Sequence, residues 1–428
     1  MSGEASAQSP QQIRILDLWK ENEVWFRDWI HRDRPWGDEK LLEAIPEEAA
    51  GQFGVKVGEY VKVDGQGYEP GQIVIVNSRE ELRKLVEGMR KVSGLLFPWF
   101  DRIVVPGLWL PHLKKIDGAR FRSFHTKRFL KALAISAALA VLGYLRPEFL
   151  MLALLGAAYY GLFPLVDSAF ALSRKVERLS VDDLNSQMVN DELFQIWLSQ
   201  RPTVLLKIGV GILILVFLLQ AWADGGRTFL AAGVNSPSLQ GAALVRDAVL
   251  NGGEWWRIVT AGLMHGSIFH ILFNGMALFS LGRVTVALVS PMLLSIVFLI
   301  AVITGSLASL WLGTASVSVG ASGGILGLLG FLLVVTNKFK GQLPDYLQSS
   351  LVQSTIVVAL FGLLGARFID NAAHAGGFIG GIIFGIVCFP WMRLAPVKTR
   401  PIVALLGWIS FAVILAGVVK VALEIWPS

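Results

Sequence analysis

Long apolar runs recur along most of the chain. From about residue 129 to the end, runs of about 18 or more apolar residues follow one another, and each is long enough to cross the ~30 Å hydrocarbon core of a bilayer as a helix. Lipid offers no hydrogen-bond partner to a backbone N–H or C=O group, so a spanning segment must satisfy those groups within its own helix. The sequence therefore predicts an all-α polytopic membrane protein with a soluble front.

The apolar runs divide the chain into segments. Two runs that flank a short hinge at Arg146 and Pro147 predict a transmembrane helical hairpin. Further runs follow near residues 203–223, 260–282, 291–314, 321–337, 351–366, 372–391 and 402–424. We expect a small cytoplasmic α/β domain at 1–110, a basic juxtamembrane segment at 111–128, the hairpin at 129–168, a cytoplasmic connector at 169–202, a membrane core at 203–391 and an extra C-terminal transmembrane helix at 402–424.

The polar first segment carries signals for strands and a helix. Residues 60–63 and 73–76 have the β-branched and aromatic composition of two short strands, and residues 64–67 are a glycine-rich turn between them. Ser78 opens a capping box, which predicts a helix from about residue 79 to 91. These signals indicate a small α/β domain, and its partner is unknown.

Basic residues predict the orientation of the helices. Lys and Arg are enriched at the cytoplasmic ends of membrane helices. A basic cluster directly precedes the first apolar run and comprises Lys114, Lys115, Arg120, Arg122, Lys127, Arg128 and Lys131. A core that starts from the cytoplasm returns there after its second, fourth and sixth runs, and Arg283, Lys338 and Arg393 follow those runs. We therefore expect the N-terminus in the cytoplasm and the C-terminus outside.

Composition narrows the class of protein further. Hydrophobic residues make up 54% of the chain and charged residues 16%, which is below the ~25% usual in soluble domains. The net charge of +6 arises from basic residues beside apolar runs, so we expect a lipid bilayer around the chain and no nucleic-acid partner. The single cysteine, Cys388, excludes an internal disulfide. The polar N-terminus has no secretory signal, so we expect the cytoplasmic (inner) membrane of a bacterium, with an organelle membrane as the open alternative.

A serine and a histidine begin two of the predicted core helices. Ser322 lies between Gly320 and Gly323, which permit a turn that exposes the hydroxyl and frees backbone N–H groups to face an anion. His374 begins the sixth core run, and the predicted topology puts it at a similar depth to Ser322, toward the outer face. A hydroxyl beside an imidazole forms a nucleophile–base pair. The alternatives are a helix N-cap role for Ser322 and a packed, satisfied histidine at 374.

Glycine stripes line the same two helices. Small residues that recur every three or four positions let two helix backbones approach closely. One stripe comprises Gly323, Gly327 and Gly330, and the other comprises Gly377, Gly381 and Gly385. We expect this contact to bring Ser322 Oγ within hydrogen-bond reach of His374.

The second core run carries two more candidate residues. His265, His270 and Asn274 form the pattern His-x4-His-x3-Asn, and the last two are four residues apart, so they project from one helix face. In the predicted topology, both lie toward the outer face, at the depth of Ser322. They are candidate hydrogen-bond donors to an oxyanion.

Few acidic residues accompany these histidines. Asp345 and Asp370 are the only carboxylates in residues 258–390. A zinc protease would lack its general base, and an aspartyl protease would lack its second facing acid, so we expect no metal. Asp370 lies four residues before His374 and could orient the imidazole, but we favour a helix cap. Three other serines in apolar runs, Ser295, Ser306 and Ser309, are expected to bond backbone carbonyl groups.

Together these residues resemble the rhomboid family of intramembrane serine proteases. The resemblance covers about residues 203–390 and rests on four motifs in the order that the family has. They are Glu254-Trp255-Trp256-Arg257, His265-x4-His270-x3-Asn274, Gly320-Ala321-Ser322-Gly323 and His374-x2-Gly377-x3-Gly381. The resemblance implies a rhomboid-like six-helix core without a cofactor that cleaves single-pass membrane proteins near the outer ends of their helices.

The resemblance also implies a role for each matching residue. Ser322 is the nucleophile and His374 the general base, and the oxyanion hole comprises His270, Asn274 and the Ser322 N–H. The residues expected to support the site are Glu254, Arg257, His265, Gly320, Gly323, Gly377 and Gly381.

Some features depart from the family pattern. Many members carry an aromatic residue four positions after the serine, where this chain has Leu326, so the histidine ring is expected to be held more loosely. The hairpin, the N-terminal domain and the helix at 402–424 lie outside the pattern. One alternative function is an inactive rhomboid-like protein that binds or escorts membrane proteins. Another is a transporter, which the gathering of polar residues toward one face disfavours.

Overall fold

A computed structural model gives the fold of the 428-residue chain. The structure describes residues 61–63, 66–68, 118–146, 153, 156–173, 194, 198, 201–229, 235–366, 369–396 and 399–426. They belong to two compact units. The first comprises Met1–Gly118, Lys175–Arg201 and Gly341–Tyr346, and the second comprises Ala119–Arg174, Pro202–Lys340 and Leu347–Ser428.

A β-hairpin is the described part of the polar N-terminal segment. β1 (Val61–Val63) pairs antiparallel with β2 (Gln66–Tyr68). The predicted turn at 64–67 is wrong in part, because Gln66 and Gly67 belong to β2 and the register leaves only two residues between the strands, as in a tight hairpin. The strand predicted at 73–76 and the helix predicted at 79–91 lie outside the described residues.

Apolar helices make up most of the second unit. Seven described helices are long and apolar enough to cross a membrane. They are α5 (Gly118–Leu145), α9 (Val204–Ala223), α13 (Ile268–Leu288), α14 (Pro291–Leu312), α16 (Asp345–Leu364), α17 (Asn371–Cys388) and α18 (Pro401–Ile425). α15 (Ser322–Lys338) is shorter, and α7 (Phe163–Ser173) follows the π-helical turn η2 (Ala157–Leu162). The chain is therefore an all-α polytopic membrane protein, as the apolar runs predict.

The second core helix begins later than the sequence predicts. The run at 260–282 predicts one helix, but α12 (Arg257–Thr260) and η5 (Ala261–Leu263) precede α13. Ser267 ends this irregular segment, because its Oγ accepts a hydrogen bond from His270 N at 3.2 Å and caps α13. Hydropathy cannot separate such a loop from a helix, since both are apolar when they are buried in protein.

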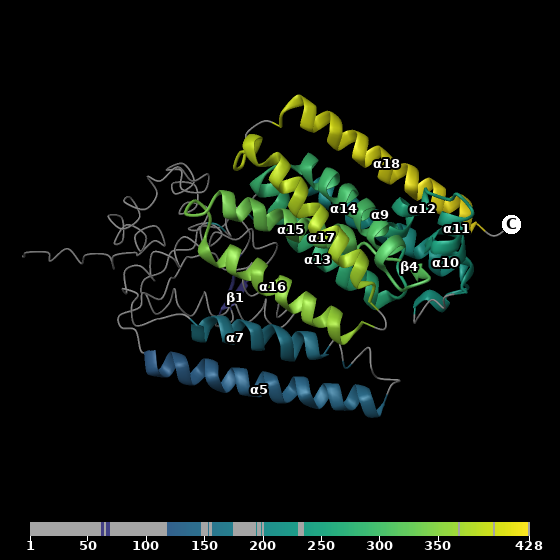
Figure 1. Ribbon diagram of the computed structural model, residues 1–428. Coiled ribbons are helices and arrows are strands. Elements are labelled where there is room, and N and C mark those ends of the chain that lie inside the picture. The colour runs from purple at the N-terminus through teal and green to yellow at the C-terminus, as the bar shows by residue number, and fades with distance from the viewer. Residues whose placement is uncertain are drawn as a thin grey trace, which may run out of the picture. The chain divides into compact units, whose positions relative to one another are not determined.

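α14 and α15 form the centre of the helical core. α14 packs against α13, α15, α17 and α18, and α15 packs against α13, α14 and α17. Figure 1 shows these helices gathered around α15. α15 is thus in contact with three other described helices, α13, α14 and α17.

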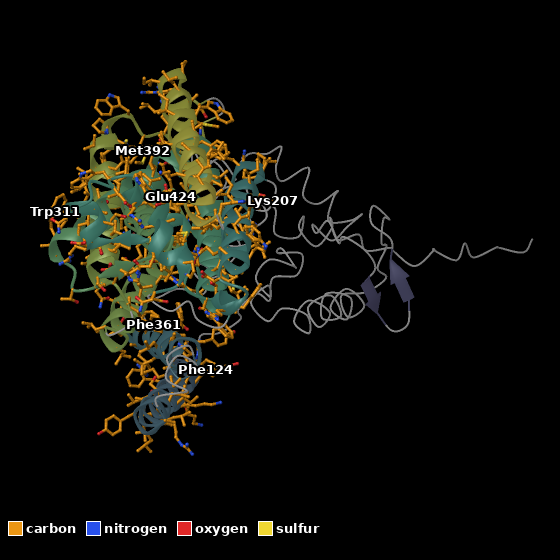
Figure 2. All side chains as sticks on the ribbon, turned by 90° about the vertical axis from the view of Figure 1, so that its right-hand side faces the viewer. Phe124, Lys207, Trp311, Phe361, Met392 and Glu424 are labelled. Carbon is orange, nitrogen blue, oxygen red and sulfur yellow. The ribbon has the colours of Figure 1, made fainter. Side chains whose placement is uncertain are left out.

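The hairpin of α5 and α7 packs on α16. Leu162 and Val166 form a buried cluster with Val357 of α16, and Phe361 packs against it. Arg128 of α5 forms an ion pair of 2.5 Å with Asp167 of α7, which joins the two arms of the hairpin. Figures 1 and 2 place this hairpin and α18 on opposite sides of the core.

The first loop, defined here as residues 224–267, connects α9 to α13. It contains η4 (Arg227–Phe229), α10 (Pro237–Ala242), β3 (Leu244–Val245), α11 (Arg246–Leu250), α12 and η5. β3 pairs antiparallel with β4 (Val317–Ser318), which lies just before α15. The first loop is therefore joined by a backbone ladder to the turn that leads into α15.

Candidate active site

Ser322 lies in the first turn of α15. The first N–H groups of an α-helix have no partner within the helix, so they can face an anion. Gly320 reaches this turn with a φ of 129°, which L side chains rarely adopt. Its N–H donates to the carbonyl oxygen of Ala261 at 2.9 Å. The serine is therefore presented by a turn that requires glycine and is tied to the first loop.

His374 lies in the first turn of α17, and Asp370 caps that helix. Asp370 Oδ1 accepts a hydrogen bond from Ala373 N at 3.0 Å, and Oδ2 accepts one from Ser309 Oγ of α14. Both carboxylate oxygens are engaged away from the imidazole, so the predicted cap is confirmed. The prediction that Ser309 bonds a backbone carbonyl is wrong, because an ionised carboxylate within reach is the stronger acceptor. The other two serines donate to backbone oxygens, Ser295 to Gly407 and Ser306 to Ile258.

The serine and the histidine meet across the α15–α17 interface. His374 Nε2 lies 2.8 Å from Ser322 Oγ. This is an ordinary hydrogen-bond length, and it lets a neutral imidazole accept the hydroxyl proton. The expected contact between these two residues is therefore present in the structure.

Glycines permit the close approach of these helices. A Cβ on Gly377 would overlap the carbonyl oxygen of Gly323, and a Cβ on Gly381 would overlap that of Gly327. The backbone of α17 therefore lies directly against the backbone of α15 along this interface, which we call the seam. Any larger residue at 377 or 381 would push α17 away from α15 and lengthen the serine–histidine distance.

Hydrogen bonding fixes the tautomer of His270. Its Nδ1 accepts a hydrogen bond from Gly266 N at 3.4 Å, so in the neutral ring Nε2 carries the hydrogen. That Nε2 is directed at Gly320, because a Cβ there would lie 2.8 Å from it. His270 therefore presents an N–H donor to the turn before Ser322.

Asn274 faces the same space with an unused donor. Its Nδ2 is buried and has no hydrogen-bond partner among the described residues. The point at which a Cβ on Gly320 would lie is 3.6 Å from Asn274 Nδ2 and 2.8 Å from His270 Nε2. The site thus contains a small space, kept open by a glycine, with two side-chain donors on one side of it.

Sequence reasoning missed Gln220 of α9. Its side-chain amide pairs with the backbone of His265: His265 N donates to Oε1 at 2.9 Å, and Nε2 donates to His265 O at 3.1 Å. His265 itself is fully buried, and burial lowers the pKa of its imidazole well below the ordinary value. A lone amide within an apolar run was the signal that could have identified Gln220, because such residues are costly in a membrane helix.

A family model described as the rhomboid domain matches residues 252–391, which include Ser322, His374, His270 and Asn274. Rhomboid protease GluP of Bacillus subtilis is 32% identical over 169 residues, which are 40% of this chain and 31% of that protein. Residues 252–391 therefore form a rhomboid domain.

Other rhomboid relatives match the same part of the chain to a similar degree. RHOMBOID-like protein 9, chloroplastic, of Arabidopsis thaliana is 31% identical over 160 residues, which are 37% of this chain and 36% of that protein. Rhomboid-like protease 5 of Toxoplasma gondii is 32% identical over 170 residues, which are 36% of this chain and 19% of that protein. The chain thus aligns with about a third or less of each of these relatives.

Arg257 occupies a buried position near the start of the rhomboid domain. Its side chain is almost wholly buried and donates to Glu254 Oε2 at 2.5 Å, to Ala243 O at 2.8 Å and to Gln240 O at 2.9 Å. These bonds join α12 to α10 and the residues that follow it.

Among the described residues, no group of three or more His, Cys, Asp or Glu side chains could hold a metal ion.

Proposed function

We propose that this rhomboid-family protein is an intramembrane serine endopeptidase that cleaves transmembrane segments of membrane proteins. Ser322 is the nucleophile and His374 the general base. One observation carries the proposal: the 2.8 Å distance between Ser322 Oγ and His374 Nε2 on two apolar helices.

The first chemical step transfers one proton and forms one bond. His374 Nε2 takes the hydroxyl proton while Ser322 Oγ attacks the carbonyl carbon of the scissile peptide bond. The carbonyl oxygen becomes an oxyanion. His270 Nε2–H, Asn274 Nδ2–H and the Ser322 N–H donate to it. This role is supported by Asn274 Nδ2, which has no hydrogen-bond partner in the described part of the chain.

The remaining steps release the two products. Protonated His374 gives its proton to the leaving amine as the C–N bond breaks, which leaves an acyl ester on Ser322. Water, deprotonated by His374, then attacks the ester carbon. The bond from that carbon to Ser322 Oγ breaks, the second product leaves as a carboxylic acid, and His374 returns the proton to Oγ. A substrate helix must unwind before attack, because its peptide carbonyls are already bonded within the helix. Substrates with Gly or Pro near the cut should therefore be preferred.

The orientation and location of the site belong to this proposal. The basic residues beside the apolar runs favour a cytoplasmic N-terminus and a site toward the outer face of a bacterial cytoplasmic membrane.

Labelling with a fluorophosphonate tests the nucleophile directly. The detergent-solubilised wild type should be labelled, and Ser322→Ala should not. Ser280→Ala, which removes an exposed hydroxyl from α13, is the matched control and should label like the wild type. A folded wild type that resists labelling would contradict the proposal and favour the inactive rhomboid-like protein.

A further inference from the structure

α18 lies outside the matched rhomboid domain, yet it packs against the first loop. It contacts α10 and α12 of that loop as well as α9 and α14. Its buried residues form a single stripe with helical spacing. They are Gly407, Ser410, Ile414, Gly417, Val421 and Ile425.

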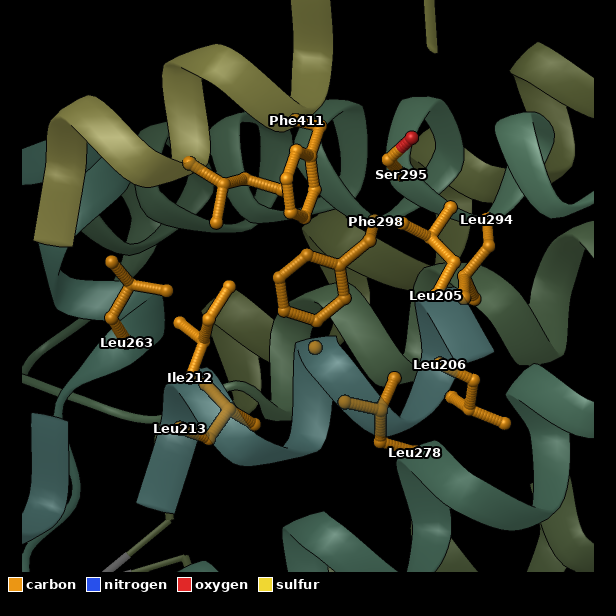
Figure 3. A pocket seen from close by; sticks show the side chains of 12 residues that line it. Leu205, Leu206, Ile212, Leu213, Leu263, Leu278, Leu294, Ser295, Phe298 and Phe411 are labelled. Carbon is orange, nitrogen blue, oxygen red and sulfur yellow. The ribbon is translucent and has the colours of Figure 1, made fainter. Parts of the chain in front are cut away.

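The first half of this stripe faces the core helices. Gly407 lies against Met292 of α14 and accepts a hydrogen bond from Ser295 Oγ at 3.0 Å. Beyond it, residues of α18, α9, α13 and α14 line an apolar pocket of ≈ 50 Å³. Figure 3 shows Phe411 of α18 and Phe298 of α14 at this pocket. This half of α18 therefore combines direct contact at Gly407 with a small apolar pocket.

Contact with the first loop is direct from Gly417 onward. A Cβ on Gly417 would lie 3.3 Å from Val259 Cγ1 and 3.3 Å from Leu263 Cδ1. The α18 backbone is thus seated on α12 and η5, and the absence of a side chain at 417 permits this distance.

The end of α18 makes two more contacts with the loop. Lys420 Nζ lies 4.5 Å from the centre of the Trp256 ring, and Arg257 Cζ lies 4.7 Å from the centre of the same ring. A Cβ on Gly241 of α10 would lie 2.9 Å from the carbonyl oxygen of Glu424. The loop therefore meets α18 at 241, at 256 and in the segment 259–263.

The segment 259–263 also contacts the turn at Gly320 that leads into α15 and Ser322. Its central residue, Ala261, accepts the hydrogen bond from Gly320 N at 2.9 Å. Gly320 stands beside His270 Nε2, two residues before Ser322. α18 therefore packs on the segment 259–263 through Val259 and Leu263. Through Ala261, the same segment binds Gly320, which borders the space beside His270 Nε2 and Asn274 Nδ2.

We propose that α18 is a positioning element of the active site and that Gly417 is its positioning residue; this inference rests on the proposed protease function. α12 and η5 are each shorter than two helical turns, so they cannot hold their own position and depend on what they pack against. A displacement of about 1 Å in a catalytic group costs on the order of 100-fold in rate. Lifting α12 and η5 away from α18 therefore slows the chemical step.

Amide exchange of the full-length protein tests the contact itself. In Gly417→Leu the peptide that contains Gly320 should exchange about tenfold faster than in the wild type, because its hydrogen bond to Ala261 opens more often. Ala416→Leu adds the same side chain one residue away, on the exposed face of α18, and should leave exchange unchanged. Gly417→Ala should be intermediate, and it carries the test if the leucine variant does not fold. Equal exchange in the 416 and 417 variants would overturn the proposal.

Kinetics tests whether the contact matters to the reaction. Gly417→Leu should lower kcat and the rate of Ser322 labelling by about tenfold and leave KM within about twofold. Leu263→Ala should restore labelling in that background, since it makes room for the new side chain. Faster exchange at Gly320 with an unchanged kcat would overturn the positioning role. A wild type that is not labelled, together with faster exchange in Gly417→Leu, would contradict the protease function and support the contact.

Discussion

Asn274 keeps a buried amide donor without a partner among the described residues. An unpaired buried donor costs about 1–3 kcal/mol of stability. In the proposed mechanism that cost becomes useful when the oxyanion forms, because the donor has no existing bond to break and no reorganisation to undergo. His270 differs, since Gly266 N–H engages its Nδ1 and fixes the ring. Asn274 is therefore the side-chain donor whose removal should affect the reaction most cleanly.

Replacing Asn274 by Ala should lower kcat by on the order of 10²–10³-fold and change KM little, because the donor acts on the oxyanion and not on the ground state. The thermal midpoint should stay level or rise slightly, since an unpaired buried amide is removed. Steady-state cleavage of a transmembrane reporter and a melting curve measure both effects. Asn251→Ala, an exposed amide of the first loop, is the control. An unaltered kcat in Asn274→Ala would remove Asn274 from the oxyanion hole.

The interface between α15 and α17 is the element that sets the serine–histidine distance. Glycine carries the contact on both helices, and carbonyl oxygens of α15 fill the places where side chains of α17 would be. The geometry of the proposed catalytic pair therefore depends on backbone positions along several turns and not only on the two residues themselves.

A single methyl group at this seam should separate the two helices. In Gly377→Ala the new Cβ would overlap the carbonyl oxygen of Gly323, so α17 must shift outward. Labelling of Ser322 should fall at least about 100-fold, and the thermal midpoint should fall as well. Gly275→Ala of α13 makes the same substitution where nothing lies within 4 Å, and it should preserve both. Normal labelling of Gly377→Ala would show that the seam does not set the distance.

The sequence could predict some of these elements and not others. Glycine spacing and polar residues in apolar runs predict the α15–α17 contact and the pairing of Ser322 with His374. Hydropathy cannot predict α12 and η5, because a loop buried in protein is as apolar as a helix. The contact of Gly417 with the first loop is also invisible in sequence, since it depends on which way a distant helix packs.

At the scale of the molecule, two additions flank the rhomboid core. The hairpin of α5 and α7 covers α16, and α18 covers the first loop on the other side (Figure 2). The rhomboid core is therefore packed against α5 and α7 at α16, and against α18 at the first loop. The orientation that we propose for the chain, with the N-terminus in the cytoplasm, rests on the basic residues beside its helices.

Cysteine accessibility tests that orientation. In a Cys388→Ala background, Asn251→Cys in the first loop should react with a membrane-impermeant maleimide added to intact cells. Lys340→Cys, just after α15, should react only after permeabilisation, because basic residues stay in the cytoplasm. Both side chains are exposed, so burial does not confound the comparison. The reverse pattern would invert the predicted topology.

The seam of glycine and carbonyl groups also bears on how lipid affects the reaction. Contacts made by side chains can be remade in several rotamers, but backbone against backbone at Gly377 and Gly381 leaves α15 and α17 a single way to meet. A thinner or thicker bilayer changes the tilt of membrane helices. It should move α15 and α17 together as one body, while α13 tilts on its own. Lipid composition should therefore change the positions of the α13 donors, His270 and Asn274, relative to the oxyanion. The distance from Ser322 Oγ to His374 Nε2 should stay constant.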